Sequence, residues 1–227
     1  MINREEFLEK SKEIVNNILT NIENLQPLTL NSLGEYETVL IIVDMVNGFA
    51  KKGVLSSPRI NNLIPEIVKI AKACSDSGIK IINFADTHTK NSIEFQSYPP
   101  HCLENTNECE IIDELKALYK TLYSDDSRVF EKNSTNGFLE PDFINYLDDY
   151  SSVKNFIIVG DCTDICIQQL ALSIKAFFNR FNLVTQVIIP VNAVDTYDLG
   201  DHSGDLMNLM ALYNMSINGI KLVKSIE

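Results

Sequence analysis

The sequence predicts a doubly wound, mostly parallel α/β sheet of six strands with helices on both faces. Six short predicted strands, most of them apolar and rich in β-branched residues, alternate with segments of helical periodicity along the chain. The run 39–43 is continuously apolar, as expected for a central parallel strand that is buried on both faces. The length of 227 residues, with 45% hydrophobic and 22% charged residues, is typical of one large domain or a domain with an appendage.

An amphipathic helix is expected before the first strand. Apolar residues recur at helical spacing over 4–25, and Pro27 is expected to stop this helix. Because the helix precedes the sheet, we expect residues 1–36 to form a helical extension and residues 37–227 to form the α/β domain. A helix with one apolar stripe is explained by packing on the domain or on a partner subunit, so it carries no functional prediction.

Strands and helices alternate over the rest of the chain. The predicted strands are 39–43, 79–84, 128–132, 156–159, 186–190 and 220–223, and the predicted helices are 61–77, 108–122, 141–150, 163–181 and 203–215. Pro65 is expected in the first turn of its helix, where proline is tolerated, and Gly78 is a typical stop signal. The segment 87–107 is predicted to be a long loop, and loops of this length in a compact domain are usually functional or disordered.

Charge and composition exclude several classes of partner. The formal net charge is −12 and no basic run is longer than Lys51-Lys52, so we expect no binding to nucleic acid or to an anionic membrane. No apolar stretch reaches 18 residues and the first residues lack an apolar signal region, so neither a membrane span nor a signal peptide is expected. The five cysteines are an odd number, which favours free thiols in a reducing cytoplasm over a disulfide framework.

The segment 160–166, Gly-Asp-Cys-Thr-Asp-Ile-Cys, joins a predicted strand to a predicted helix. This order places Cys166 in the first turn of a helix, where the helix dipole is expected to lower the pKa of the thiol. The backbone N–H groups of Cys162 and Cys166 are candidate donors to an oxyanion. The alternative is that Cys166 is a small buried apolar residue, which is the commoner role of a free cysteine.

Reactive side chains follow four different predicted strands. In a doubly wound sheet the site lies beyond the carboxyl ends of the strands, where Asp44, Asp86, Lys132 and Cys166 are expected. Asp44 is a candidate base for the Cys166 thiol, and Lys132 can hold the thiolate. Such a triad suits attack on a carbonyl carbon, with the aspartic acid returning the proton to a leaving amine. Taken singly, an aspartate after a strand is often a helix cap, and a lysine is often an ordinary edge charge.

A second group of polar residues lies in and just before the loop 87–107. Asp86, His88, Glu94 and His101 include two of the three histidines of the chain. Imidazole and carboxylate ligands suit one divalent transition metal, with zinc the first choice and iron or manganese also compatible. The alternative is a polar loop that contains these residues without a ligand role.

Three segments resemble the motifs of the isochorismatase-like cysteine hydrolases, and within them the nicotinamidases. In chain order they resemble the strand end with the family's aspartate (43–49), the segment with its lysine (130–138) and its Gly-x-x-Thr-Asp-x-Cys turn (160–166). The resemblance implies that Asp44 is the base, Cys166 the nucleophile and Lys132 the third member of the triad. It also implies a cis peptide bond between Asp161 and Cys162.

The likeness to nicotinamidases extends to their metal loop and aromatic residues. The segments 86–88 and 98–101 are similar to this loop, which implies that the ion is held by Asp86, His88, Glu94 and His101. In those enzymes the metal binds the pyridine nitrogen of nicotinamide, and an aromatic pair that matches Phe49 and Tyr98 encloses the ring. The sequence departs from the family pattern at Asn47-Gly48, and Tyr98 stands where tryptophan is frequent.

The resemblance implies a cytoplasmic metal-containing amidase that converts nicotinamide to nicotinate and ammonia through a thioester on Cys166. It also implies a homo-oligomer that acts on a small-molecule amide. Two alternatives stay open. One is hydrolysis of another small amide or a carbamoyl substrate, and the other is a non-catalytic family member that serves as a binding protein.

Overall fold

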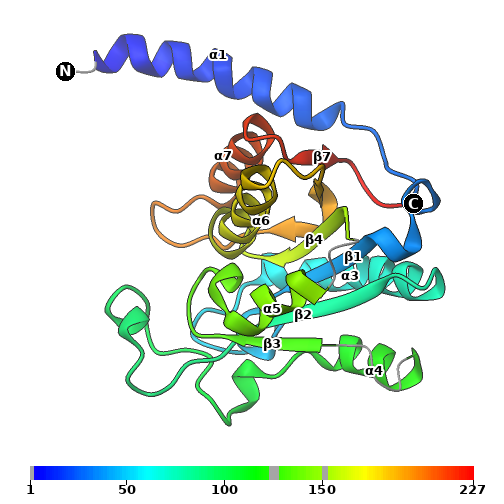
Figure 1. Cartoon of the computed structure of the whole chain (residues 1–227). Coiled ribbons are helices and arrows are strands. Elements are labelled where there is room, and N and C mark those ends of the chain that lie inside the picture. The colour runs from blue at the N-terminus through cyan, green and yellow to red at the C-terminus, as the bar shows by residue number, and fades with distance from the viewer. Residues whose placement is uncertain (1–2, 123–127, 150–152) are drawn as a thin grey trace.

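The computed structural model describes residues 3–122, 128–149 and 153–227, which contain one seven-stranded sheet (Figure 1). The strands are β1 Thr38–Val43, β2 Lys80–Asp86, β3 Arg128–Lys132, β4 Asn155–Asp161, β5 Gln186–Pro190, β6 Val194–Asp195 and β7 Lys221–Val223. Their order is β3-β2-β1-β4-β5-β7, β6 pairs with β4, and each of these pairings is parallel. The predicted doubly wound, mostly parallel α/β fold is confirmed. Strand order reverses between β1 and β4, which is where ligands bind in such sheets.

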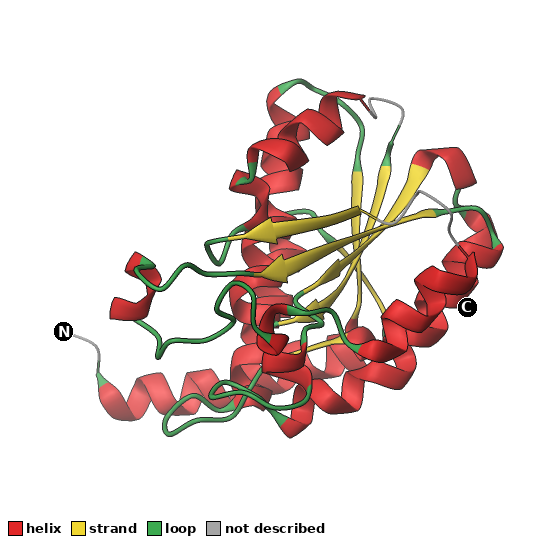
Figure 2. Cartoon of the chain, turned by 90° about the horizontal axis from the view of Figure 1, so that it is seen from below, coloured by secondary structure: helices red, strands yellow, loops and turns green. Residues whose placement is uncertain are grey.

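Side chains of β1 alternate between two hydrophobic cores, one on each face of the sheet. Leu40 and Ile42 belong to one core, and Val39, Ile41 and Val43 belong to the other. The first core is covered by α3 Pro58–Asp76 and α4 Asp113–Leu122, and the second by α5 Pro141–Asp149, α6 Gln168–Arg180 and α7 Gly204–Ile217. Figure 2 shows helices on both sides of the strands. Burial on both faces explains why β1 is apolar at every position after Thr38.

The N-terminal helix α1, Arg4–Glu23, lies outside the two helical layers and packs beside α7 (Figure 1). Ile18 is its buried residue, whereas Phe7 and Ile14 are more than half exposed. The chain after α1 is fixed to the C-terminal residues, because Leu28 N–H donates to Ser225 O at 2.9 Å. We keep the division into residues 1–36 and 37–227 as a proposal. None of the described helices is long and apolar enough to cross a membrane.

Several elements differ from the prediction in their bounds. The sheet has a seventh strand, β6, whose two residues are too few to produce a periodic signal. Helix α3 begins at Pro58 behind the capping residue Ser57, so Pro65 lies inside the helix and not in its first turn. Helix α4 begins at Asp113, later than expected, because 107–109 forms a separate 3₁₀ turn. Residue 150, predicted as the end of a helix, lies outside the described residues.

Two segments near the carboxyl edge of the sheet are more ordered than the sequence predicts. The expected long helix over 163–181 is divided into a π-helical turn, Thr163–Ile167, followed by α6. The expected loop 87–107 contains a 3₁₀ turn at Ile93–Gln96 and a parallel bridge between His88 and Leu103. Both segments hold side chains at the edge of the sheet where the predicted site lies.

Candidate active site

A pocket of about 210 Å³ opens at the carboxyl edge of the sheet. Its lining includes eight of the residues singled out from the sequence, which are Asp44, Phe49, Asp86, Glu94, Tyr98, His101, Cys162 and Cys166. Lys132 and His88 are fully buried and contact these lining residues from behind. The pocket therefore brings together the triad residues and the residues of the metal loop.

Asp44 follows β1 in a left-handed conformation, with φ of 54°. Its N–H donates to Phe84 O at 3.0 Å, and its carbonyl accepts from Val46 N–H at 2.8 Å. This turn ends the strand and leaves the carboxyl group, which is fully buried, at the edge of the sheet. Residue 160 in the neighbouring strand β4 must be glycine, because a Cβ there would lie 2.1 Å from Val43 O. The close approach of β1 and β4 thus positions Asp44 beside the segment that carries Cys166.

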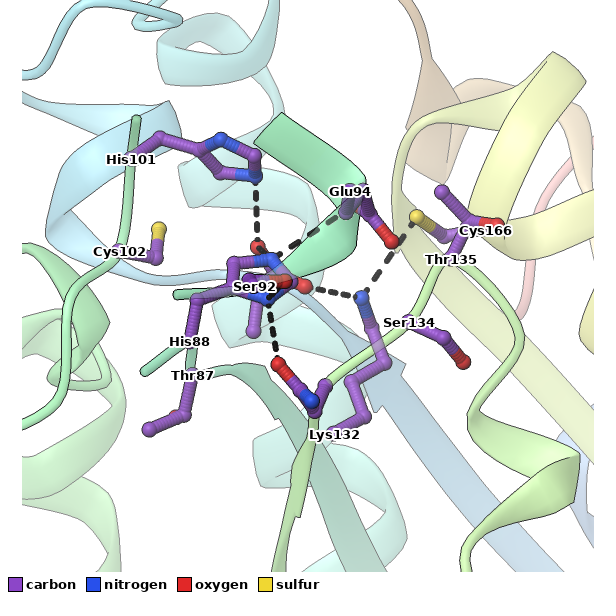
Figure 3. Close-up of polar contacts among 12 residues, drawn as sticks. Thr87, His88, Ser92, Glu94, His101, Cys102, Lys132, Ser134, Thr135 and Cys166 are labelled. Carbon is purple, nitrogen blue, oxygen red and sulfur yellow. Dashed lines mark hydrogen bonds and ion pairs between the residues drawn. The ribbon is translucent and has the colours of Figure 1, made fainter. Parts of the chain in front are cut away.

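Lys132 lies at the centre of the site (Figure 3). Its Nζ is 2.9 Å from Asp44 Oδ2, 2.6 Å from Asp86 Oδ1 and 3.8 Å from Cys166 Sγ. The register of β2 and β3 pairs Asp86 with Lys132, which explains the shortest of these contacts. A single buried ammonium group therefore contacts the predicted base, the predicted nucleophile and a predicted metal ligand.

Burial and the neighbouring charges have opposite effects on the pKa values of Lys132, Asp44 and Asp86. Burial would lower the pKa of Lys132, but Asp44 and Asp86 outweigh it and raise that pKa well above its usual value. Burial raises the pKa of Asp44 to about 6, even though Lys132 acts to lower it. Burial also acts to raise the pKa of Asp86, yet this pKa lies well below its usual range, with the Lys132 ammonium group as the strongest opposing charge. Near neutral pH the site thus contains a charged lysine and an Asp44 carboxylate that can accept a proton.

The pKa of the Cys166 thiol differs in direction from the sequence prediction. It lies in the π-helical turn and is 9% exposed. Burial raises the pKa of Cys166 well above its usual value, and Lys132 offsets only part of this effect. The expected lowering by a helix dipole was therefore wrong, because desolvation of the thiolate dominates. The thiol needs a base, and the buried carboxyl group of Asp44 lines the same pocket.

The peptide bond between Asp161 and Cys162 is cis, as the family resemblance implies. The Cys162 carbonyl accepts from the Ile165 and Ile167 N–H groups at 3.2 and 3.0 Å, which closes the turn before Cys166. The backbone N–H groups of Cys162 and Cys166 stay a prediction as oxyanion donors. The sequence reasoning did not single out Asp161, whose buried carboxyl also lines the pocket.

Asp86, His88, Glu94 and His101 form one cluster whose ligand atoms lie within 4.8 Å of one another. Asp86 Oδ2 is 2.9 Å from His88 Nε2 and 3.0 Å from His101 Nε2. Each ring is oriented through its other nitrogen, since His88 Nδ1 contacts Asn133 Oδ1 at 2.9 Å and His101 Nδ1 contacts Pro99 O at 2.8 Å.

These contacts test whether the cluster suits a metal. The partners of both Nδ1 atoms are oxygen acceptors, so each Nδ1 carries the hydrogen and each Nε2 presents a lone pair. Among the residues that the structure describes, Asp86 Oδ2 and His88 Nε2 are also buried without a hydrogen-bond partner. A cation between these two atoms would remove the repulsion between the Asp86 carboxylate and the lone pair of His88 Nε2. Two ligand atoms that each lie about 2.1 Å from a shared ion are roughly 3–3.5 Å apart, which is close to the distances found here. The residues therefore fit a divalent transition metal.

The two predicted aromatic residues border the metal cluster. The Phe49 ring centroid is 5.6 Å from that of His101, and the Tyr98 centroid is 6.2 Å from it. Both residues line the pocket together with Tyr197, which the sequence analysis did not single out. Asn133, which orients His88, was also missed, although it directly follows Lys132 in the sequence.

A doubly wound sheet with a pocket at its carboxyl edge is typical of α/β proteins that bind small molecules. The chain belongs to the isochorismatase family, because residues 38–218 match the sequence model of the isochorismatase domain.

Similar proteins include nicotinamidases. Nicotinamidase 1 of Arabidopsis thaliana is 28% identical over 252 aligned positions, covering 100% of this chain and 99% of the relative. The crystal structure of a nicotinamidase from Bacillus subtilis superposes with a TM-score of 0.69 at 23% identity, covering 82% of this chain and 99% of the other. A pyrazinamidase of Pyrococcus horikoshii, solved in complex with zinc, has a TM-score of 0.65 at 25% identity and covers 83% and 99%.

Proposed function

We propose that the protein is a cysteine-dependent amidase that hydrolyses nicotinamide to nicotinate and ammonia. The observation that supports this most strongly is the position of the Lys132 ammonium group. It contacts Asp44 and Asp86 directly and lies 3.8 Å from Cys166 Sγ, in one pocket with the metal cluster. The full-length similarity to a plant nicotinamidase adds independent support.

In the proposed reaction Asp44 takes the proton of the Cys166 thiol as Sγ attacks the carboxamide carbon. Asp44 then gives this proton to the carboxamide nitrogen, the C–N bond breaks and ammonia leaves, which forms a thioester on Cys166. Asp44 next takes a proton from a water molecule that attacks the thioester. Sγ leaves and recovers the proton, nicotinate is released, and the free thiol is restored.

Lys132 and backbone N–H groups are proposed to stabilise the negative charges that develop during the reaction. The ammonium group beside Asp44 and Cys166 stabilises the thiolate as the proton moves to the carboxylate. The N–H groups of Cys162 and Cys166 are the proposed donors to the oxygen of the tetrahedral intermediate. No charge has to enter the site from solvent, because the proton passes between two groups that are both buried.

The ring of the substrate has a proposed site beside the cluster of Asp86, His88, Glu94 and His101, which would hold the metal. A bound divalent ion, with zinc as the first choice, would supply a Lewis acid for the pyridine nitrogen. Phe49 and Tyr98 line the same part of the pocket and are proposed to enclose the ring.

The test is release of ammonia by the purified protein from nicotinamide, in parallel with a panel of small aliphatic amides and carbamoyl compounds. We expect nicotinamide to be the preferred substrate and Cys166→Ala to lose at least about 10³-fold in kcat with an unchanged fold. Cys109→Ala is the matched control, because this thiol lies outside the pocket lining. Absence of ammonia release from nicotinamide by the metal-loaded protein would refute the proposal.

A further inference from the structure

A short loop between β6 and α7, residues 196–203, forms one wall of the pocket. Tyr197 and Leu199 of this loop line the cavity. The loop folds back on itself, because Leu199 and His202 exchange backbone hydrogen bonds of 3.0 and 2.9 Å. The loop comes about 30 residues after the nucleophile turn in the sequence, so only the fold places it at the site.

Arg59 of α3 fixes the start of this loop. Its Nε donates to Thr196 O at 2.9 Å, and its Nη2 donates to Asp195 Oδ1 at 2.8 Å. The end of the loop is fixed as well, since Asp198 Oδ1 accepts from Gly204 N–H at 2.7 Å. A Cβ at Gly204 would lie 2.8 Å from Arg59 Nε, so a larger residue there would displace the arginine side chain. The loop is thus held at both ends in one arrangement.

His202 joins the loop to the nucleophile turn. Its ring stacks on the Tyr197 ring, with 4.0 Å between centroids and an interplanar angle of 8°. Its Nδ1 contacts Tyr197 O and its Nε2 contacts Asp164 Oδ2, both at 2.9 Å. Asp164 lies two residues before Cys166 in the π-helical turn. Both contacted atoms are oxygen acceptors, so the His202 ring is held at both of its nitrogens.

We propose that Tyr197 is a specificity residue that packs against the aromatic ring of the substrate, and that His202 is the positioning residue that holds it there. This inference rests on the proposed amidase function. One face of the Tyr197 ring is occupied by His202, which leaves the rest of the ring for the pocket. Burial raises the pKa of Tyr197 to about 12, so the phenol stays neutral beside the acidic groups of the site.

Through its contact with Asp164, His202 also fixes the position of the Tyr197 loop relative to the nucleophile turn. Since the same ring contacts the Tyr197 wall and the turn that carries Cys166, the aromatic wall and the nucleophile keep a fixed separation. A planar aromatic amide that fills this separation would present its carboxamide to Sγ. A small aliphatic amide would make no contact with the wall, so it would not depend on Tyr197.

The test measures kcat and KM for nicotinamide with metal-loaded wild-type protein and with Tyr197→Phe, Tyr197→Ala, His202→Ala and the double alanine variant. We expect Tyr197→Ala to raise KM about two- to tenfold, the range of an aromatic pair, with kcat changed less than about twofold. Tyr197→Phe keeps the ring and should retain the wild-type KM. The matched control is Tyr36→Ala, because Tyr36 is 82% exposed and lies outside the pocket lining.

A double-mutant cycle separates positioning from a merely structural role. If His202 acts through Tyr197, His202→Ala raises KM in the single variant but adds nothing to Tyr197→Ala. Additive effects of the two substitutions would overturn the positioning role. An unchanged KM in a folded Tyr197→Ala protein would overturn the inference as a whole.

Binding of nicotinamide to metal-loaded Cys166→Ala protein, measured by calorimetry, gives a readout without turnover. A weaker Kd when Tyr197→Ala is added would support the inference even if hydrolysis of nicotinamide were not observed. An unchanged Kd would contradict it. The failure of the inference can therefore be told apart from the failure of the proposed function.

Discussion

Replacing Lys132 by methionine removes the charge that contacts the buried carboxylates of Asp44 and Asp86 while keeping a side chain of similar length. Asp44 and Asp86 lie 2.9 and 2.6 Å from Nζ and are almost fully buried. Breaking a buried ion pair by removing one partner costs about 3–5 kcal/mol, because the remaining charge is left uncompensated. We expect Lys132→Met to lose about this much free energy of unfolding at pH 7, together with at least about 10³-fold in kcat.

The loss should depend on pH with a defined sign. In the wild type Lys132 holds the pKa of Asp86 well below its usual range, so the ion pair persists in weak acid. In the variant the Lys132 charge no longer offsets burial, so the folded-state pKa of Asp44 rises further above its unfolded value of about 3.9, and the pKa of Asp86 rises as well. The variant therefore loses stability as pH rises above about 4, and its difference from the wild type shrinks as pH falls toward that value.

Urea denaturation at pH 4.5 and pH 7, with metal removed from both proteins by a chelator, measures the two differences. The control is Lys154→Met, which removes an ion pair with Glu37 whose partners are about half exposed. Exposed pairs contribute at most about 1 kcal/mol, so this variant should stay close to the wild type at both pH values. A Lys132→Met protein within about 1 kcal/mol of the wild type at pH 7 would refute the reasoning.

Three further predictions concern activity and metal. The value of kcat/KM for nicotinamide should fall as pH decreases through about 6, since protonated Asp44 cannot accept the thiol proton; a flat profile between pH 5 and pH 7 would contradict this. Asp44→Asn should lower kcat by at least about 10³-fold, with binding of nicotinamide little changed in calorimetry. His101→Ala should lose bound metal, measured by elemental analysis, and should raise KM more than it lowers kcat; wild-type metal content in this variant would remove His101 from the ligand set.

The sequence was most informative where burial acts on whole segments. The central strand is apolar at consecutive positions because both of its faces are covered, so the run 39–43 predicted β1 and its place in the sheet. Asp44, Lys132 and Cys166 could be placed at one edge because parallel strands end together. The two-residue strand β6 and the π-helical turn before α6 have no periodic signal, so they were not predicted.

The parts of the site that the sequence did not predict depend on contacts between distant segments. The pKa of Cys166 depends on how completely the fold desolvates it, and local position in a helix predicted the opposite direction. Tyr197 lines the pocket and His202 supports it in a loop that is held by Arg59 and Asp164, which lie far away in the sequence. Such residues could be recognised only once the fold had brought these segments together.

A trapped acyl-enzyme tests the central claim most directly. Rapid acid quenching of the metal-loaded protein during turnover of nicotinamide, followed by proteolysis and mass spectrometry, should find a nicotinoyl group in place of one proton. We expect this group on Cys166 and its absence from Cys166→Ala protein, which still contains Cys162. A nicotinoyl group on Cys162, or ammonia release at the wild-type rate without Cys166, would contradict the central claim.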